Sequence, residues 1–157
     1  MQYIKEDNRE VKAGFTLIEV LVVMGIIALL STIVLVAINP SRQFAQSRDT
    51  QRTSNVVSIL NAIGQRAVDN RGIFETGCAA GVIPSTTTAI KSGGFDLYPC
   101  IVPTYMAMMP VDPKVGNFTS ASSYDTGYTV VRDATTGRIT VAAPSTEIAT
   151  PTITISR

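Results

Sequence analysis

The chain has 157 residues, which is enough for one modest domain together with an anchoring segment. Its formal net charge is only +1 and it contains no histidine, so the composition gives no support for a nucleic-acid-binding surface. It also lacks the commonest general base and metal ligand. We therefore expect no specific nucleic-acid partner and no enzymatic activity. Apolar residues make up 45% of the chain, and much of this excess lies between Phe15 and Ile38.

A long uncharged stretch near the N-terminus predicts a membrane-spanning helix over residues 15–39. No residue from Val20 to Ile38 is charged. With the preceding residues, a helix rising 1.5 Å per residue covers roughly the 30 Å thickness of the bilayer's hydrocarbon. A secretory signal peptide would carry small residues after its apolar part, whereas Ala13 and Gly14 come before it. Cleavage after Gly14 would therefore keep the apolar helix.

Glu19 places a carboxylate just inside this apolar stretch. At the centre of a bilayer a charged side chain costs about 2.5 to 3.5 kcal/mol, and near the interface it costs less. One interpretation is an interfacial glutamate beside a plain signal anchor. Another is a designated positive partner, because cleavage after Gly14 would create an amine on Phe15, about one helical turn away. Either that amine or the amine of a neighbouring identical chain could neutralise Glu19.

The run Gly14–Leu21, with the sequence GFTLIEVL, resembles the processing site of type IV pilins and type II secretion pseudopilins. The resemblance implies that a prepilin peptidase cuts after Gly14, removes residues 1–14 as a cytoplasmic leader and N-methylates Phe15. It also implies a homo-oligomeric helical filament in which Glu19 pairs with the amine of a neighbouring Phe15. Many members of the family have a proline within the apolar helix. The first proline here is Pro40, where the helix could kink or restart.

Residues 40–70 are predicted to form an amphipathic helix that continues into a globular domain. Pro40 and Ser41 suit a helix start, and an apolar stripe is expected to pack against a sheet. The stripe has 4-3-4 spacing and consists of Val56, Leu60, Ile63 and Ala67. Residues 46–55 are almost wholly polar. We expect this stretch to be a solvated face available to neighbouring subunits, with its charged residues and the preceding arginine exposed: Arg42, Arg48, Asp49 and Arg52.

Residues 71–157 are expected to form an extracytoplasmic β-rich domain. Clusters of Gly, Pro, Ser and Thr from residue 70 to 123 predict a long connection with short elements. Cys78 and Cys100 favour a disulfide that closes this connection in an oxidising compartment, the alternative being two free buried thiols. Residues 128–143 predict a hairpin, and the alternation in residues 150–157 predicts a third strand. The expected fold is α+β and type IV pilin-like, with a long helix packed on a small antiparallel sheet.

Carboxylates in the last third raise the question of calcium. Major secretion pseudopilins bind calcium in their C-terminal region, and Asp112 and Asp125 are candidate ligands here. Their spacing matches no calcium motif, so the other interpretation is that they are turn and strand-end residues. No other cofactor is expected.

The resemblance implies a structural pilin held first in the inner or cytoplasmic membrane as a single-pass precursor with an extracytoplasmic C-terminus. The assembly machinery of that membrane would then move it into an extracellular or periplasmic filament. The alternatives are a type II secretion pseudopilin and a signal-anchored binding domain that never polymerises. A filament of this kind could serve motility, adhesion, DNA uptake or secretion.

Overall fold

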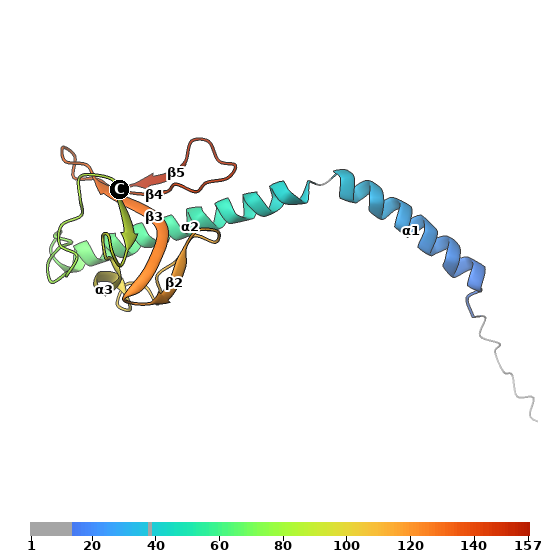
Figure 1. Cartoon of the computed structure of the whole chain (residues 1–157), viewed down its shortest axis with the longest axis horizontal. Coiled ribbons are helices and arrows are strands. Elements are labelled where there is room, and N and C mark those ends of the chain that lie inside the picture. Colours follow the sequence, from blue (N-terminus) through green and yellow to red (C-terminus); the bar gives the residue numbers. More distant parts are fainter. Residues whose placement is uncertain (1–13, 38) are drawn as a thin grey trace, which may run out of the picture. The chain divides into compact units, whose positions relative to one another are not determined.

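The computed structural model describes residues 14–37 and 39–157, and the chain divides into two compact units. The first unit ends at Pro40, and its described part is built around helix α1 (Leu17–Ala37). The second unit starts at Ser41, one residue into the next helix, and holds the rest of the chain (Figure 1). The predicted leader, residues 1–14, lies outside the described residues except for Gly14.

Helix α1 is the long apolar helix that the sequence predicts. Its described side chains, up to Leu35, are all exposed to solvent in the isolated chain. By length and composition, Leu17–Leu35 is long and apolar enough to cross a membrane. Such a surface is unfavourable in water. Lipid or further protein must therefore cover α1.

Helix α2 (Pro40–Asp69) supplies one wall of the globular core, with Pro40 at its start as expected for this residue. The predicted stripe faces inward: Val56, Leu60 and Ile63 are buried, and Ala67 packs at the edge of the core. The 3.6-residue period of the helix brings these positions onto one face.

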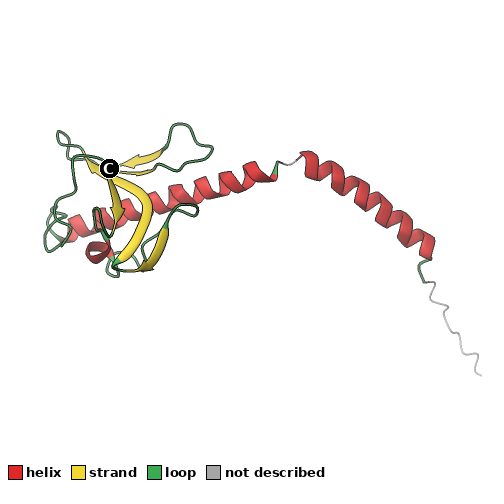
Figure 2. Ribbon diagram, in the orientation of Figure 1, coloured by secondary structure: helices red, strands yellow, loops and turns green. Residues whose placement is uncertain are grey.

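Five strands form an antiparallel sheet in the order β1-β3-β4-β5, with β2 also pairing with β3 (Figure 2). The predicted hairpin is β3 with β4, in which Val130 lies opposite Val141, and the predicted third strand is β5. The strands are β1 (Thr88–Lys91), β2 (Asn117–Ser120), β3 (Ser123–Arg132), β4 (Ile139–Ala143) and β5 (Ile153–Ser156). The predicted α+β fold is confirmed.

The core lies between α2 and the inner face of the sheet. Alternate residues of β3 face inward, as the two-residue period of a strand requires, and the short helix α3 (Tyr98–Ile101) closes one side. The inward residues of β3 are Tyr124, Thr126, Tyr128 and Val130.

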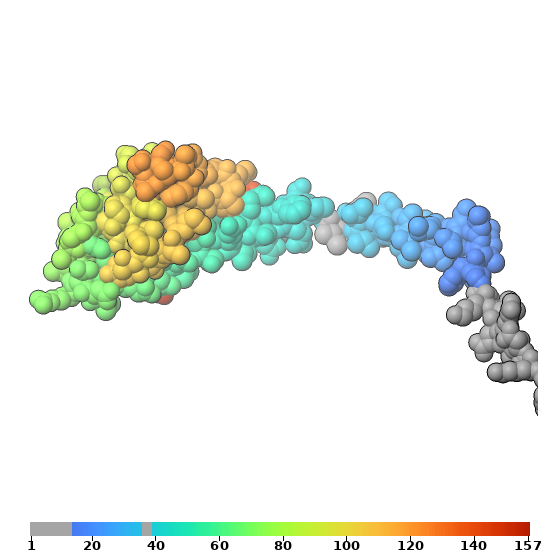
Figure 3. All heavy atoms as spheres, turned by 90° about the horizontal axis from the view of Figure 1, so that it is seen from below, coloured from blue at the N-terminus to red at the C-terminus, as the bar shows by residue number. Residues whose placement is uncertain are grey.

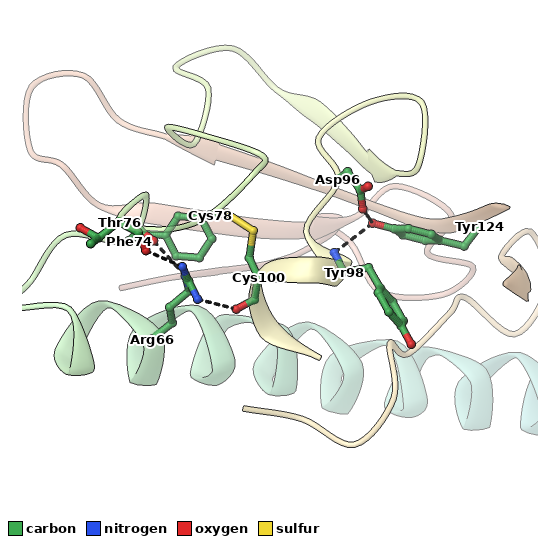
Figure 4. The surroundings of a disulfide bond; sticks show 8 residues. All are labelled: Arg66, Phe74, Thr76, Cys78, Asp96, Tyr98, Cys100 and Tyr124. Atoms are coloured by element: carbon green, nitrogen blue, oxygen red, sulfur yellow. Dashed lines mark hydrogen bonds between the residues drawn. A yellow bond between two sulfur atoms is a disulfide. The ribbon is translucent and has the colours of Figure 1, made fainter. Parts of the chain in front are cut away.

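The predicted disulfide between Cys78 and Cys100 is present and ties the connection after α2 to α3. Beside it, the buried Arg66 guanidinium donates hydrogen bonds to the carbonyl oxygens of Phe74 at 3.0 Å, Thr76 at 2.6 Å and Cys100 at 2.9 Å (Figure 4). Buried carbonyls need such partners. Arg66 and the disulfide therefore organise the same irregular segment.

Arg52 corrects the prediction that residues 46–55 form a solvated face. Its side chain is 0% exposed. Nε donates to Asp112 at 2.7 Å, while Nη1 donates to Asp49 at 2.8 Å and to Glu147 at 2.9 Å. The segments that carry Asp112 and Glu147 cover this side of α2. Each contributes a carboxylate that neutralises the buried cation.

The close approach of Asp112 to β3 depends on a glycine. Gly127 has φ +73°, and a Cβ atom there would lie 2.8 Å from Cβ of Asp112. The Asp112 N–H donates to the carbonyl oxygen of Thr126 at 2.8 Å. Any larger residue at position 127 would meet both backbone strain and this contact.

Asp49 fastens the segment between β4 and β5 to α2. Its carboxylate accepts N–H hydrogen bonds from Glu147 at 3.0 Å, Ile148 at 2.7 Å and Ala149 at 3.0 Å. Burial alone raises the pKa of Asp49. The three backbone hydrogen bonds, together with Arg52, outweigh burial and lower this pKa to about 2.

Glu147 completes the charged cluster. Both of its oxygens accept hydrogen bonds from Arg48, at 2.7 and 2.6 Å, and Lys114 lies 3.4 Å from the second. The hydrogen bonds from Arg48 and Arg52 lower the pKa of Glu147 well below its usual range. Six charged residues thus join α2 to two later segments: Arg48, Asp49, Arg52, Asp112, Lys114 and Glu147.

Replacing Arg52 with methionine is expected to lower the free energy of unfolding of the unit 41–157 by about 3 to 5 kcal/mol, because buried carboxylates lose their counter-charge. Urea unfolding followed by circular dichroism measures this loss. The matched control is Arg48→Met, whose side chain is 34% exposed. There we expect a loss of about 1 kcal/mol or less. Equal losses in the two variants would contradict the claim that the buried Arg52 side chain contributes more to stability than the partly exposed Arg48 side chain.

The Asp49 carboxylate should make stability depend on pH in a defined window. Its pKa is lower in the folded chain, at about 2, than the value of about 3.9 in an unfolded chain. Its contribution is therefore complete above about pH 4 and is lost as the pH falls towards 2. Asp49→Asn should be less stable than the wild type at pH 7, and the difference should shrink between pH 4 and pH 2. Urea unfolding at several pH values measures the difference in free energy of unfolding between wild type and variant. A difference that stays constant from pH 4 to pH 2 would contradict the lowered pKa of Asp49.

Candidate functional site

Glu19 and Thr16 form a capping box at the start of α1. The helix begins at Leu17, so Thr16 occupies the cap position and Glu19 the third helical position. The Glu19 N–H donates to Oγ1 of Thr16 at 3.3 Å. In return, the Thr16 N–H and hydroxyl donate to Oε2 of Glu19 at 3.3 and 3.2 Å. Free N–H groups at a helix start find their partners in this way.

These bonds hold the Glu19 carboxylate in a favourable position without cancelling its charge. The partial positive charge at the helix N-terminus stabilises a nearby carboxylate. Thr16 contributes only neutral donors, however. Glu19 is the one charged residue of α1, because every other residue from Leu17 to Ala37 is uncharged. A counter-charge is still needed wherever this helix end becomes buried in apolar surroundings.

The peptide bond between Gly14 and Phe15 lies just outside the helix. Residues 14–16 have no regular secondary structure, and the Phe15 side chain is 86% exposed. A Cβ added at Gly14 would meet no atom within 4 Å, so the fold around it does not require glycine. An irregular, exposed backbone is the kind of segment that a protease can reach.

Further along α1, the Thr32 hydroxyl finds its partner within the helix. The hydroxyl of Thr32 donates to the carbonyl oxygen of Ala28 at 2.9 Å, one turn earlier. Such bonding is what an apolar environment demands, because no water is available there. The contrast with Glu19 is clear, since a hydroxyl can be satisfied within the helix and a full charge cannot.

The structure engages the two calcium candidates in other ways. Asp112 is buried, with Oδ2 accepting from Arg52 and Oδ1 accepting the N–H groups of Lys114 and Val115 at 2.8 and 3.0 Å. Asp125 lies in β3 and accepts the Gly127 N–H at 2.9 Å. These contacts favour the interpretation as turn and strand residues. Across residues 14–37 and 39–157, no group of three or more His, Cys, Asp or Glu side chains is arranged to hold a metal ion.

Sequence reasoning overlooked Thr16 as a partner of Glu19. The signal was local, because a threonine three residues before a glutamate at a helix start is the pattern of a capping box. The structure thus brings Phe15, Thr16 and Glu19 together at one helix end.

The comparison with protein families points to the same segment. A family model described as the prokaryotic N-terminal methylation motif matches residues 11–35, which include Gly14, Phe15, Glu19 and most of α1. No curated protein and no solved structure matches the chain. With an apolar helix, a small antiparallel sheet and one disulfide in the fold, this N-terminal motif is the prepilin signature of type IV pilins and pseudopilins.

Proposed function

We propose that this chain is a structural subunit of a type IV pilus-like filament and not an enzyme. The observation that carries the proposal is Glu19, a single charge at the start of a fully exposed apolar helix, inside the matched motif. The motif implies processing by a prepilin peptidase and assembly into pilus-type filaments. The roles of individual residues are part of the proposal.

Processing is the first step. The peptidase cuts between Gly14 and Phe15, removes the leader and methylates the new terminal amine of Phe15. The exposed, irregular backbone at this bond supports the assignment. Methylation of an amine keeps its positive charge. The mature N-terminus can therefore still carry a positive charge one residue before Thr16.

Assembly is expected because the apolar surface of α1 must be covered. In the precursor, lipid covers its apolar surface, and in the filament the α1 helices of neighbouring subunits cover it. The capping bonds engage only Oε2 of Glu19. The amine of a neighbouring Phe15 can therefore pair with Oε1 while the capping box stays intact. A subunit displaced along the axis would bury both charges unpaired, and this cost sets the register.

The outer unit fits an extracytoplasmic location. Its disulfide is stable in oxidising compartments outside the cytoplasm. The precursor therefore spans the inner or cytoplasmic membrane once through α1, with residues 41–157 on the far side. Assembly machinery of that membrane then extracts it into the filament.

A type II secretion pseudopilin is the nearest alternative, because it shares the N-terminal motif. Calcium-dependent stability of the outer unit would favour it. Asp112, however, is engaged by Arg52 and by two backbone N–H groups. Both calcium candidates, Asp112 and Asp125, thus have protein partners, and the calcium measurement distinguishes the pilus from the pseudopilus.

The mature chain is expected to begin at N-methyl-Phe15. Mass spectrometry of the protein from its native host measures this directly. Gly14→Val should keep the leader, because a branched side chain replaces the glycine at the bond to be cut. Gly25→Ala, within α1, is the matched control and should be processed normally. A wild-type chain that still begins at Met1 would overturn the proposed processing and, with it, the filament.

Glu19→Ala is expected to abolish surface filaments while leaving a processed subunit in the membrane, because the neighbouring amine loses its partner. Electron microscopy of cells and of sheared surface fractions measures filament number. Glu75→Ala removes a carboxylate from the loop after α2 and serves as the control, with normal filament number expected. Undiminished filaments in Glu19→Ala would refute the pairing scheme.

A further inference from the structure

Strand β5 forms one margin of the sheet and pairs only with β4. Figure 1 shows it at the margin opposite β2. Directly after the strand, Arg157 exchanges two backbone hydrogen bonds with Ile139, at 2.8 and 3.0 Å. In an antiparallel pair, such residues alternate with residues whose N–H and C=O groups point the other way. Thr154 and Ser156 therefore direct their backbone groups to the open side of β5.

The open side of β5 is regular and uncharged, unlike the other free margins of the sheet. Strands β1 and β2 each contain a register shift where they pair with β3. The pairing of β5 with β4 has no shift, and the strand contains neither a charged residue nor a proline. Shifts, charges and prolines are the features that keep an edge strand from pairing with another chain. Strand β5 therefore offers backbone donors and acceptors that a further extended backbone can match.

One flank of α2 faces β5 across two hollows. Figure 3 shows part of α2, in cyan, exposed at the surface of the outer unit. The first hollow, of 330 Å³, lies beside Ile153, and the second, of 630 Å³, lies beside Arg157. The α2 residues that line them, together with Val57 between them, recur every three or four positions and so share one side of the helix. They are Gln46, Thr50, Thr53, Val57, Asn61, Gly64 and Val68. We call this flank and the open side of β5 the trough.

The trough has no unpaired charge among the described residues. Its α2 flank is uncharged, and the charged residues that border the hollows each interact with another group of the chain. These residues are Arg42, Asp49, Asp69 and Arg157. The hydroxyls of Thr50 and Thr53 each donate to a carbonyl oxygen one turn earlier, at 3.0 Å. An uncharged segment can therefore cover this flank without burying an unpaired charge.

We propose that the trough docks an extended, uncharged segment of a partner polypeptide, which adds to β5 as a further strand. The backbone groups of Thr154 and Ser156 pair with its backbone, and its alternate side chains point towards α2. The outward N–H and C=O groups select an extended backbone, and the neutral flank selects uncharged side chains. The inference uses only groups of the second unit, so it is tested independently of the filament.

The probe is a fluorescein-labelled peptide, TITISR, which repeats residues 152–157 and has no charge before its last residue. Fluorescence anisotropy measures its binding to the full-length chain in detergent. Thr154→Pro removes one outward N–H, and an edge strand tolerates proline where the N–H faces solvent. We expect this variant to bind the probe about fivefold more weakly, because one hydrogen bond is lost. The matched control, Thr154→Val, keeps the N–H and should bind like the wild type. Ser156→Pro removes the second outward N–H and replaces Thr154→Pro if that variant does not fold.

The α2 flank is tested by filling the larger hollow. A Cβ at Gly64 would meet no atom within 4 Å, so Gly64→Leu places a side chain in the hollow without a clash. Leucine also favours a helix more than glycine does. Probe binding should therefore fall at least as much as in Thr154→Pro. Ser58→Leu adds the same side chain at an exposed position of α2 that borders neither hollow, and it should leave binding unchanged. Circular dichroism checks that each variant is folded.

Weaker binding in Thr154→Pro and Gly64→Leu, with both controls normal, is the expected result. If the wild type does not bind the probe, or if Thr154→Pro binds it as well as Thr154→Val, β5 does not accept a strand and the proposal is wrong. Equal binding by Gly64→Leu and Ser58→Leu would remove α2 from the site and refute the trough. Dimers of the wild type that form without peptide and are lost in Thr154→Pro would make a second copy the occupant and overturn the assignment to a partner.

Discussion

The Glu19 carboxylate lies at the start of an otherwise uncharged helix, and its charge must be compensated in whatever apolar surroundings that helix enters. In the precursor, the end of the helix can remain near the membrane interface, where Thr16 and the helix terminus stabilise the anion. Packing of α1 against other apolar helices removes this access to water. A full positive charge is then required, and in the proposed filament the processed Phe15 amine would supply it.

Arg52 and Glu19 differ in where their counter-charges come from. Arg52 is a buried cation whose partners, Asp49, Asp112 and Glu147, all belong to the same chain. The outer unit therefore neutralises its own buried charge. Glu19 has hydrogen-bond donors within the described part of the chain, but these donors are neutral. The uncompensated negative charge of Glu19 lies at the end of the chain that polymerisation would bury.

Local patterns in the sequence predicted most of the fold. Helical spacing identified the inward stripe around Leu60, and alternation identified β5 and the β3–β4 hairpin, because these signals are repeated over neighbouring residues. The burial of Arg52 could not be predicted in this way. Two of its three carboxylate partners lie 60 and 95 residues further along the chain. A polar stretch that the rest of the fold covers looks identical, in sequence, to one that faces water.

The charged cluster also bears on how a filament subunit would transmit force. In the proposed filament, tension would act on α2, and the Asp49 carboxylate holds this helix to the segment before β5 through three backbone N–H groups. Displacement at Asp49 or Arg52 would leave buried charges unpaired. In the proposed filament the ion-pair cluster would thus resist shear between helix and sheet, because sliding of the helix would separate Asp49 and Arg52 from their partners on the later segments.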